Sequence, residues 1–482
     1  MKIRPEYGLT FDDVLLVPKR SAIRSRTAVS TASWLTASIH LQIPIVSANM
    51  DTVTESKMAI AMAEQGGIGV VHRFMTVERQ VECVRKVKRA ESFVVENPIT
   101  IRPTASVKAA RLKMGEAGIG GLMVTDEEGR LLGLVTTRDV LLAPDGDSPV
   151  ESVMTLREKL VVGKDSEPLE SARRALFEHR IEKLPLVNAE DRVTGLITTQ
   201  DIIKIQEHPR ATKDTKGRLR VGVALGVHAN DFSRAEACVS AGADVLVVDI
   251  AHGHSQHTID MVRRLKERFS AVDVIAGNVA TAEGVQDLCQ AGADAVKVGV
   301  GSGSICITRV VTGFGVPQLT AVQECAEAGR ALGIPIISDG GVRTSGDLTK
   351  ALAAGASTVM LGSMLAGTDE SPGAVIVREG RRYKVVRGMA SLSANVERKA
   401  IDRAGTVSND EIWEQVVPEG VEATVPYRGA VADILYQLVG GLRSGMSYAG
   451  AVTIAELWEK AEFIRITSAG QKESRAHDVS VL

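Results

Sequence analysis

The chain alternates between short apolar runs and longer segments with helical periodicity. Eight runs rich in Val, Ile and Leu end in small or polar residues, as buried parallel strands followed by tight turns do. These runs are residues 43–50, 68–72, 220–226, 245–251, 273–279, 295–301, 334–339 and 358–363. The pattern predicts eight strands that are buried on both faces.

Amphipathic segments with the period of a helix lie between most of these strands. They cover residues 231–241, 258–269, 282–291 and 345–354. Three turns from helix to strand share the phrase Ala-Gly-Ala followed by Asp or Ser, beginning at Ala241, Ala291 and Ala354. Such helix–turn–strand units favour an α/β fold, a closed (β/α)8 TIM barrel, over an open sheet. Polar residues gather at the strands' carboxyl ends, where these barrels carry their chemistry.

A separate repeat interrupts the barrel pattern between its second and third strands. The sequences GLVTTRD at 133–139 and GLITTQD at 195–201 match closely, and each follows a predicted strand and an amphipathic helix. We therefore expect residues 91–210 to form an inserted domain. The barrel would then be built from residues 1–90 and 211–482.

The repeated motif resembles that of a tandem pair of CBS modules, a Bateman domain. The resemblance implies that Thr136, Asp139, Thr198 and Asp201 contact the ribose of an adenine or guanine nucleotide. The alternative interpretation is that each Asp caps the helix that follows, which is a common role of Asp.

The sharpest chemical signal is the sequence GVGSGSICITR at residues 299–309, at the end of a predicted strand. Repeated glycines let a backbone adopt positive φ and approach a ligand closely, which suits a cysteine presented to a substrate. Cys306 is therefore a candidate nucleophile, with Ser304, Thr308 and Arg309 near it. A lone cysteine in a loop is more often structural. The glycine spacing also differs from the GxGxxG dinucleotide fingerprint.

Two further strand ends predict an anion-binding site. The sequence Asp-Gly-Gly, ending at Gly341, follows the seventh strand, and Gly362 and Ser363 follow the eighth. In (β/α)8 barrels this pair of loops often binds phosphate through backbone N–H groups. Asp339 would then be free to accept hydrogen bonds from ribose hydroxyls. Taken alone, an Asp-Gly-Gly sequence is only a turn.

The segment at residues 388–429 is punctuated by Gly and Ser and shows little regular period. Long irregular loops of compact domains often act as active-site lids. We therefore expect an irregular, mobile flap at about residues 390–430.

Composition narrows the class of protein. Among 482 residues, Lys and Arg number 57 and Asp and Glu number 59, a formal net charge of -2, so nucleic acid is not an expected partner. The five cysteines are scattered without CxxC pairs, which favours reduced thiols over a zinc site. Because we find no apolar leader and no membrane-spanning run, we expect a cytoplasmic protein without a membrane partner.

The ordered motifs together resemble the inosine 5′-monophosphate (IMP) dehydrogenase and guanosine 5′-monophosphate (GMP) reductase family over nearly the whole chain. They lie at residues 9–18, 47–53, 248–254, 277–279, 299–309, 339–341, 387–389 and 417–420. The resemblance implies a (β/α)8 barrel with a CBS-pair insertion after the second βα unit, usually a homotetramer. It also implies a purine nucleoside monophosphate substrate and NAD as cofactor.

The resemblance also assigns roles residue by residue. Cys306 would attack C2 of the purine to form a covalent adduct, hydride would pass from C2 to the nicotinamide of NAD, and Thr308 would lie within reach. The positions that match the nucleotide site are Met50, Ser304, Asp339, Gly341, Gly362, Ser363, Met389 and Glu419. The positions that match the nicotinamide side are Asp249, Gly299 and Gly301. The carbonyls of Gly301, Gly303 and Cys306 match a potassium site, completed by residues near Glu473 of a neighbouring subunit.

Three positions depart from the pattern of dehydrogenases in this family. Those enzymes carry an Arg-Tyr pair in the flap that activates water, whereas here the match is Arg403 followed by Ala404, so Arg403 would act as base without the tyrosine. Val386 stands in place of a tyrosine that usually helps to hold phosphate. Ala390 stands in place of a glycine near the purine 6-substituent.

Three functions follow from these matches and departures. We favour IMP dehydrogenation, in which IMP, NAD and water give xanthosine 5′-monophosphate (XMP) and NADH, because residues 387–392 and 417–422 are dehydrogenase-like. The alternative is GMP reduction, or C2 oxidation of another 6-substituted purine nucleotide such as AMP, which the missing tyrosine and Ala390 favour. A nucleotide sensor without catalysis is the third, and the Cys306 loop and Asp339 argue against it.

Overall fold

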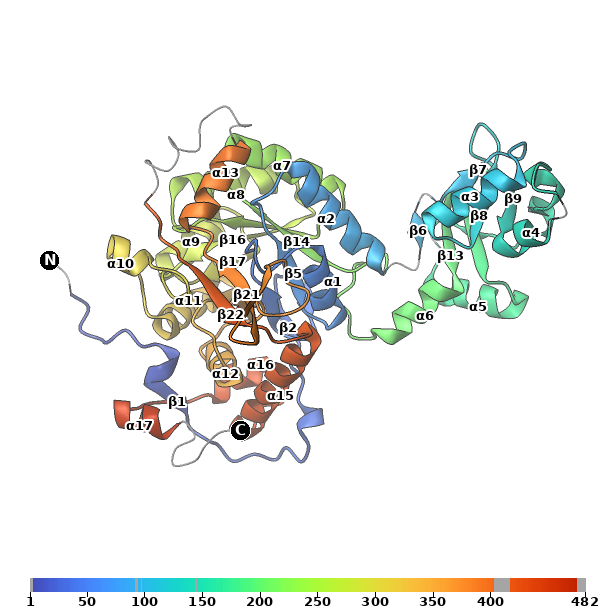
Figure 1. The fold of residues 1–482 in the computed structure, drawn as a ribbon. Helices are drawn as coiled ribbons and strands as arrows, with labels where there is room; N and C mark the ends of the chain where they lie inside the picture. The colour runs from blue at the N-terminus through green and yellow to red at the C-terminus, as the bar shows by residue number, and fades with distance from the viewer. Residues whose placement is uncertain are drawn as a thin grey trace. The chain divides into compact units, whose positions relative to one another are not determined.

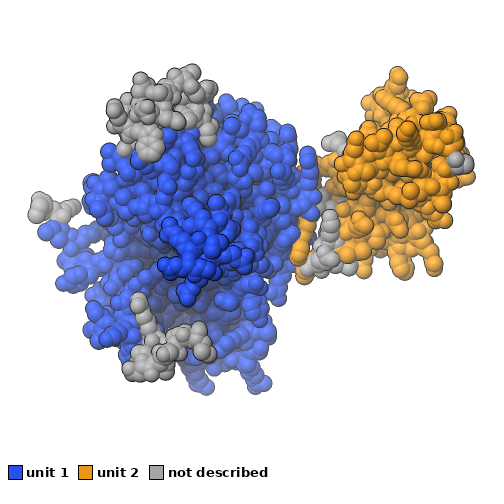
Figure 2. All heavy atoms as spheres, in the orientation of Figure 1, with its two compact units in different colours: residues 1–90, 210–214, 219–482 blue, residues 91–209, 215–218 orange. Residues whose placement is uncertain are grey.

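The computed structural model describes residues 3–91, 94–96, 98–143, 145–165, 167–402 and 417–474. The chain divides into two units, shown in different colours in Figure 2. Unit 1 comprises residues 1–90, 210–214 and 219–482, and unit 2 comprises residues 91–209 and 215–218. In the part of the chain that the structure describes, no helix has the length and apolar character needed to cross a bilayer.

A closed parallel barrel forms the centre of unit 1 (Figure 1). Its strands neighbour one another in the order β14-β15-β16-β17-β18-β19-β4-β5. Their bounds are β4 Ile45–Ser47, β5 Ile68–Val71, β14 Val221–Leu225, β15 Val245–Asp249, β16 Asp273–Val279, β17 Ala295–Val298, β18 Ile336–Asp339 and β19 Thr358–Leu361. The prediction of an eight-stranded (β/α)8 barrel is confirmed.

Burial on both faces explains why the barrel strands read as continuous apolar runs. Val46 and Val247 belong to a cluster in the barrel interior, whereas their neighbours Ile45 and Val248 belong to the larger cluster between strands and helices. The short strands β2 (Ser33–Trp34) and β3 (His40–Leu41) pair with each other, and Leu41 adds to the interior cluster. The alternation fixes which residues of each strand face inward.

Helices surround the barrel (Figure 1). They are α1 Ser56–Glu64, α2 Val77–Ala90, α7 Ala229–Ser240, α8 Gln256–Arg268, α9 Ala282–Gln290, α11 Gln318–Leu332, α12 Ser345–Ala353, α15 Val431–Ala449 and α16 Ile454–Lys460. Some begin at a threonine cap: the Thr281 hydroxyl accepts a hydrogen bond from the Gly284 amide, and Thr344 accepts one from Asp347.

The remaining elements of unit 1 lie outside the barrel pattern. A three-stranded antiparallel sheet joins β20 (Val375–Arg378), β21 (Arg381–Arg387) and β22 (Glu422–Pro426). Strand β1 (Val14–Leu16) pairs with β23 (Phe463–Arg465). The short helices are α10 Thr308–Thr312, α13 Leu392–Asp402 and α17 Ser468–Glu473, with 3-10 turns at Phe11–Asp13 and Arg26–Ala28.

The expectation of an irregular segment at 388–429 is wrong for helix α13 and strand β22. Ser391 explains where the helix begins, because its hydroxyl accepts a hydrogen bond from the Ala394 amide at 3.4 Å. The helix also buries Ala394 and Val396. Two buried apolar residues do not establish a helical period, so the sequence alone does not predict this helix.

Unit 2 consists of two similar halves with one four-stranded sheet each. The sheet orders are β10-β9-β8-β7 and β11-β12-β13-β6. The elements are β6 Val95–Glu96, β7 Thr100–Ile101, α3 Val107–Ala117, β8 Gly121–Thr125, β9 Leu131–Thr136, α4 Thr137–Leu142, β10 Thr155–Leu156, β11 Gly163–Lys164, α5 Leu169–His179, β12 Lys183–Val187, β13 Val193–Thr198 and α6 Thr199–Glu207, with 3-10 turns at Val150–Ser152 and Arg157–Lys159. The Leu131 amide donates to the Asp191 carbonyl and Val193 to Gly129, so the hairpin turns of the two halves pair.

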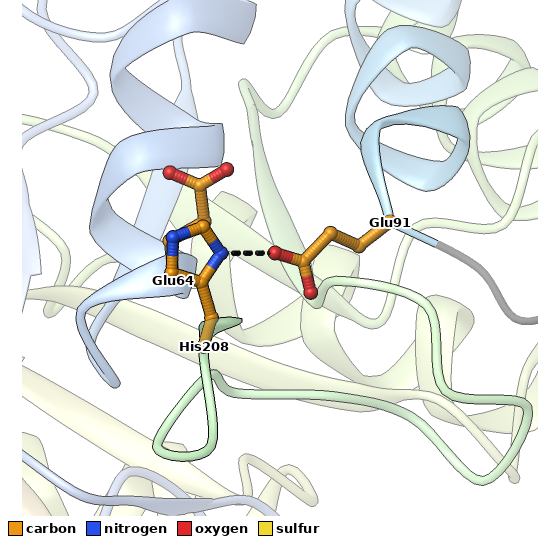
Figure 3. Close-up of side chains that lie close together, drawn as sticks. All are labelled: Glu64, Glu91 and His208. Atoms are coloured by element: carbon orange, nitrogen blue, oxygen red, sulfur yellow. Dashed lines mark hydrogen bonds and ion pairs between the residues drawn. The ribbon is translucent and has the colours of Figure 1, made fainter. Parts of the chain in front are cut away.

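The chain enters and leaves unit 2 close to one point. Glu91 begins the unit, and His208 follows the last residue of α6. The His208 ring nitrogen and the buried Glu91 carboxylate form a hydrogen bond (Figure 3). This contact joins the two ends of the insertion.

Candidate active site

A cavity of about 570 Å³ lies at the carboxyl ends of the barrel strands, within the size range of small-molecule sites. Residues from β15, β16, β17, β18 and β19, together with the loops after β4, β5, β15, β17 and β18, line it. Residues 388–390, together with Val417, Glu419 and Gly420, supply further lining positions. The cavity therefore lies at the end of the barrel where enzymes of this fold carry their chemistry.

The loop after β17 brings Cys306 to the cavity wall. Gly299, at the start of the loop, has φ +152°, and a Cβ there would lie 1.9 Å from the Asp339 carbonyl oxygen, so a side chain would force the loop away from β18. The Cys306 amide donates to the Gly303 carbonyl at 3.1 Å. Cys306 itself is a free, partly buried thiol.

A chain of hydrogen bonds leads from the cysteine to a carboxylate. The Cys306 thiol donates to Thr308 Oγ1 at 3.2 Å, and the Thr308 hydroxyl donates to Glu419 Oε2 at 2.8 Å. Backbone hydrogen bonds fix this arrangement: the Ile307 amide donates to the Glu419 carbonyl at 2.8 Å, and the Val421 amide donates to the Ile305 carbonyl at 3.0 Å. Such a chain can carry a proton between sulfur and carboxylate.

Asp339, at the end of β18, presents a carboxylate to the same cavity. Its Oδ2 accepts hydrogen bonds from Asn278 Nδ2 at 2.9 Å and from Lys297 Nζ at 2.7 Å. Within the described residues, no side-chain hydrogen bond uses Asp339 Oδ1. That oxygen is available to a hydroxyl of a ligand.

The predicted site residues fall into two groups. The cavity lining includes Met50, Asp249, Gly299, Gly301, Gly303, Cys306, Thr308, Asp339, Met389 and Glu419. Ser304, Gly341, Gly362 and Ser363 are not among the lining residues. The Ser304 and Ser363 hydroxyls nevertheless lie 3.2 Å apart, and a Cβ at Gly362 would lie 3.0 Å from the Met50 sulfur. The loops after β17 and β19 thus lie side by side next to the cavity.

Sequence reasoning missed Lys297, which is 2 % exposed and lines the cavity. Its ammonium donates to Asp249 Oδ1 at 2.7 Å, to Asp339 Oδ2 at 2.7 Å and to the Asn278 side-chain oxygen. Burial alone would lower the pKa of a lysine, but the carboxylates of Asp249 and Asp339 raise the pKa of Lys297 above its ordinary value. The sequence does contain a signal for it: a lysine within the otherwise apolar run 295–298 indicates a buried cation, which needs carboxylate partners.

Lys297 in turn shifts the pKa of Asp249 in the opposite direction. Burial raises the pKa of this carboxyl, and the charge of Lys297, with its hydrogen bond, outweighs burial and lowers the pKa below its usual range. Asp249 therefore stays ionised at neutral pH.

Comparison with known proteins connects this geometry to a family. The model of the IMP dehydrogenase / GMP reductase domain matches residues 8–477. The chain belongs to the IMP dehydrogenase / GMP reductase family. It is 54 % identical over 475 residues to an inosine-5′-monophosphate dehydrogenase of Nitrosopumilus maritimus, with 98 % of this chain and 99 % of that protein covered. It is 50 % identical over 484 residues to a GMP reductase of Leishmania donovani, with 98 % of each covered.

Solved structures of the family agree with the fold. The crystal structure of a GMP reductase from Trypanosoma brucei in complex with guanosine 5′-monophosphate superposes with a TM-score of 0.88 at 47 % identity, and covers 98 % of both chains. A dehydrogenase and a reductase of the family thus each match 98 % of this chain. The family alone does not separate the two reactions.

The positions that depart from the dehydrogenase pattern of the family lie in different parts of the structure. Val386 is fully buried in the main core, whereas Ala390 lines the cavity and its carbonyl accepts a hydrogen bond from the Glu419 amide at 3.0 Å. Arg403 and Ala404 lie outside the described residues.

Glu473 is exposed at the end of α17, and its predicted contact concerns a neighbouring subunit, so that role stays a prediction.

Arg387 joins the flap helix to the loop after β4. Its Nε donates to Asp51 Oδ2 at 2.6 Å, and its Nη1 donates to Glu397 Oε1 on α13 at 2.9 Å. The Asp51 amide lies 3.4 Å from the Met389 sulfur. The hydrogen bond from Arg387 lowers the pKa of Glu397, which keeps the ion pair intact at neutral pH.

The repeated Thr and Asp residues of unit 2 cap helices. Asp139 Oδ2 accepts hydrogen bonds from the Thr136 amide at 2.8 Å and hydroxyl at 2.7 Å, at the start of α4. Asp201 Oδ2 accepts the same bonds from Thr198 at 3.1 Å and 2.6 Å, at the start of α6. Helix capping is therefore one role of these residues, and their contact with a nucleotide stays a prediction.

Proposed function

We propose that this protein is a nicotinamide-dependent oxidoreductase that acts at C2 of a purine nucleoside 5′-monophosphate and oxidises IMP to XMP. The observation that carries the proposal is the hydrogen-bonded chain from Cys306 through Thr308 to Glu419 on the wall of a cavity that also contains Asp339. The direction of the reaction is supported by two IMP dehydrogenase relatives that are 54 % and 53 % identical to this chain, compared with 50 % for a GMP reductase.

The Cys306 sulfur, as a thiolate, would add to C2 of IMP while the electron pair of the C2–N3 double bond moves to N3. NAD, when bound, would supply the acceptor for the hydride of C2, and loss of that hydride would restore the double bond. Water would then add to C2, giving one proton to N3 and losing the other, and the carbon–sulfur bond would break to give XMP and the Cys306 thiolate. Thr308 and Glu419 offer a path for the proton of the thiol.

The residues on the cavity wall are suited to both ligands. Asp339 Oδ1 can accept a hydrogen bond from a ribose hydroxyl of the nucleotide, and the charged Asp249 can do the same for the nicotinamide ribose. Gly299 and Gly301 have positive φ, so the backbone between them can approach a flat ring closely. Outside the cavity lining, Ser304, Gly341, Gly362 and Ser363 would bind the phosphate, and on the cavity wall Met50 and Met389 would lie beside the base.

GMP reduction is the second candidate reaction. GMP, NADPH and a proton would give IMP, ammonia and NADP⁺, with Cys306 again bonded to C2 while the amino group leaves. The specific observation in its favour is Ala404, which stands where dehydrogenases of the family carry a tyrosine for water activation. Reductive deamination consumes no water, and Thr308 with Glu419 could protonate the leaving amine.

One assay separates these reactions. Purified protein is incubated with IMP and NAD, with GMP and NADPH, and with AMP and NAD, while nicotinamide absorbance is recorded and products are separated by chromatography. We expect XMP from IMP, formed slowly, because Arg403 would activate water without its tyrosine. Conversion of GMP without any XMP would establish the reductase instead. Binding of nucleotides without turnover would support a sensor.

We further propose a potassium site formed by the carbonyls of Gly301, Gly303 and Cys306, completed by the region of Glu473 from a neighbouring subunit in a homotetramer. Carbonyl oxygens are the ligands that potassium prefers in proteins. The ion would hold the loop that carries the thiol. Potassium should therefore raise the rate and sodium should replace it poorly, and equal rates in potassium and a bulky organic cation would reject the site.

Unit 2, in this proposal, is a CBS pair that binds an adenine or guanine nucleotide and regulates the barrel of unit 1. Asp139 and Asp201 use Oδ2 for helix capping, which leaves Oδ1 for a ribose hydroxyl. Replacement of about residues 92–209 by a short linker should retain basal turnover and abolish any response to these nucleotides. Failure of the remaining chain to fold would show that this boundary is wrong.

A further inference from the structure

Lys297 is a buried cation on the cavity wall that plays no part in the chemistry above. The three protons of its ammonium meet three acceptors, on Asp249, Asn278 and Asp339. Asn278 adds a bond of its own from Nδ2 to Asp339 Oδ2 at 2.9 Å. The four side chains form one connected network.

The barrel is built to admit this lysine. Lys297 lies on β17 opposite Gly277 on β16 and Ile337 on β18. A Cβ at Gly277 would lie 2.7 Å from Cβ of Lys297, so glycine at that position leaves room for the lysine stem. The lysine thus reaches Asp249 at the end of β15 and Asp339 at the end of β18, on opposite sides of its own strand.

We infer that Lys297 is a positioning residue that holds Asp249, on the nicotinamide side, and Asp339, on the nucleotide side, against one shared cation, so that both ligands are aligned relative to each other. The inference deepens the proposed function and rests on it. Each carboxylate uses one named oxygen on the lysine, Oδ1 of Asp249 and Oδ2 of Asp339. The rotation of both carboxylates is therefore fixed before any ligand binds.

Electrostatics gives the lysine a second effect. Without the cation, the two carboxylates of Asp249 and Asp339 would repel each other in a poorly solvated pocket, so they would turn away from each other. Arg73, from the loop after β5, is a further cation that lowers the pKa of Asp249. The lysine therefore keeps Asp249 ionised at neutral pH and holds both carboxylates in place.

The test replaces Lys297 by methionine and uses Lys384→Met as the matched control. Lys384 is also buried, at 3 % exposed, but among the described residues its ammonium donates to the carbonyls of Thr368 and Ser371, which are not among the cavity-lining residues. Both variants should lower the temperature of unfolding. Only Lys297→Met should reduce kcat/KM for nucleotide and nicotinamide, by about 100-fold, because a small displacement of aligned groups has that effect.

Two readouts separate positioning from simple packing. In Lys297→Met, kcat/KM should fall further as the pH is lowered from about 8 to about 6, because the uncompensated Asp249 carboxylate then takes up a proton, whereas the wild type should lack this step. In a background of Asp249→Asn, which removes one of the two negative charges, Lys297→Met should weaken nucleotide binding several-fold less than it does alone.

The outcomes distinguish this inference from the proposed function. If the wild type converts neither IMP nor GMP with its cofactor, the proposed function fails. If the wild type is active but Lys297→Met keeps its pH profile, or if the two substitutions act independently, the inference alone is overturned. Loss of stability without a change in kcat/KM, as expected for Lys384→Met, would also overturn it.

Discussion

Aspartate carboxylates accept hydrogen bonds in both units of this protein, but the donors lie at very different separations in the sequence. In unit 2, Asp139 and Asp201 bond to a threonine three residues earlier, at the start of the same helix. In the barrel, Asp339 and Asp249 bond to Lys297, which lies 42 and 48 residues away in sequence. The local pairs stabilise a helix end. The distant pairs exist only once neighbouring strands have assembled, and they shape a cavity.

The difference predicts that substitutions in the barrel cavity change chemistry, whereas capping substitutions in unit 2 change stability. The largest effect is expected for Cys306→Ala, which should lower turnover by about a thousand-fold or more, because alanine lacks the sulfur that forms the proposed bond to C2. Nucleotide binding, measured by calorimetry, should persist. Cys289→Ala, on helix α9 and outside the cavity lining, is the control and should keep normal turnover.

A smaller effect is expected at the end of the hydrogen-bonded chain. Glu419→Gln keeps the shape of the side chain but removes the proton acceptor beyond Thr308, so kcat should fall by about 100-fold while KM for the nucleotide changes less. Steady-state kinetics would measure both. The control is Glu422→Gln, an exposed position on β22. Equal kcat values for Glu419→Gln and Glu422→Gln would show that Glu419 does not take part in proton transfer.

In unit 2, loss of a helix cap should cost stability alone. The Ser106 hydroxyl accepts a hydrogen bond from the Ala109 amide at 3.2 Å, at the start of α3. Ser106→Ala should destabilise unit 2 by about 1 kcal/mol. Chemical denaturation would measure this loss, and turnover should not change. A large loss of turnover in Ser106→Ala would contradict the prediction that capping substitutions in unit 2 affect stability and not catalysis.

The smallest effect concerns pH and the flap helix. Because the hydrogen bond from Arg387 lowers the pKa of Glu397, this pair stabilises the fold above the ordinary glutamate pKa, and the contribution is lost as the pH falls through the lowered value. Glu397 is 57 % exposed, so the contribution should not exceed about 1 kcal/mol. Glu397→Gln should therefore destabilise the protein slightly at neutral pH and not at all in strong acid, as thermal unfolding would show.

The same contrast explains what the sequence could and could not predict. Apolar runs with a glycine turn predicted the barrel, because both faces of each strand are buried. The glycine-flanked Cys306 and the sequence after β18 indicated the cavity end of the barrel. Helix α13 was missed because its apolar positions are few, and Lys297 was missed because its partners lie on other strands. Local signals can be read from the sequence, whereas pairings across strands need the fold.

The most direct test of the account is to look for the bond between Cys306 and C2. The protein would be mixed with IMP and NAD, and separately with GMP and NADPH, quenched in acid during turnover, digested and analysed by mass spectrometry. We predict that the peptide containing Cys306 carries the mass of a purine nucleotide in at least one of the two mixtures, and that Cys306→Ala does not. Sustained turnover without any modified Cys306 peptide would contradict the account.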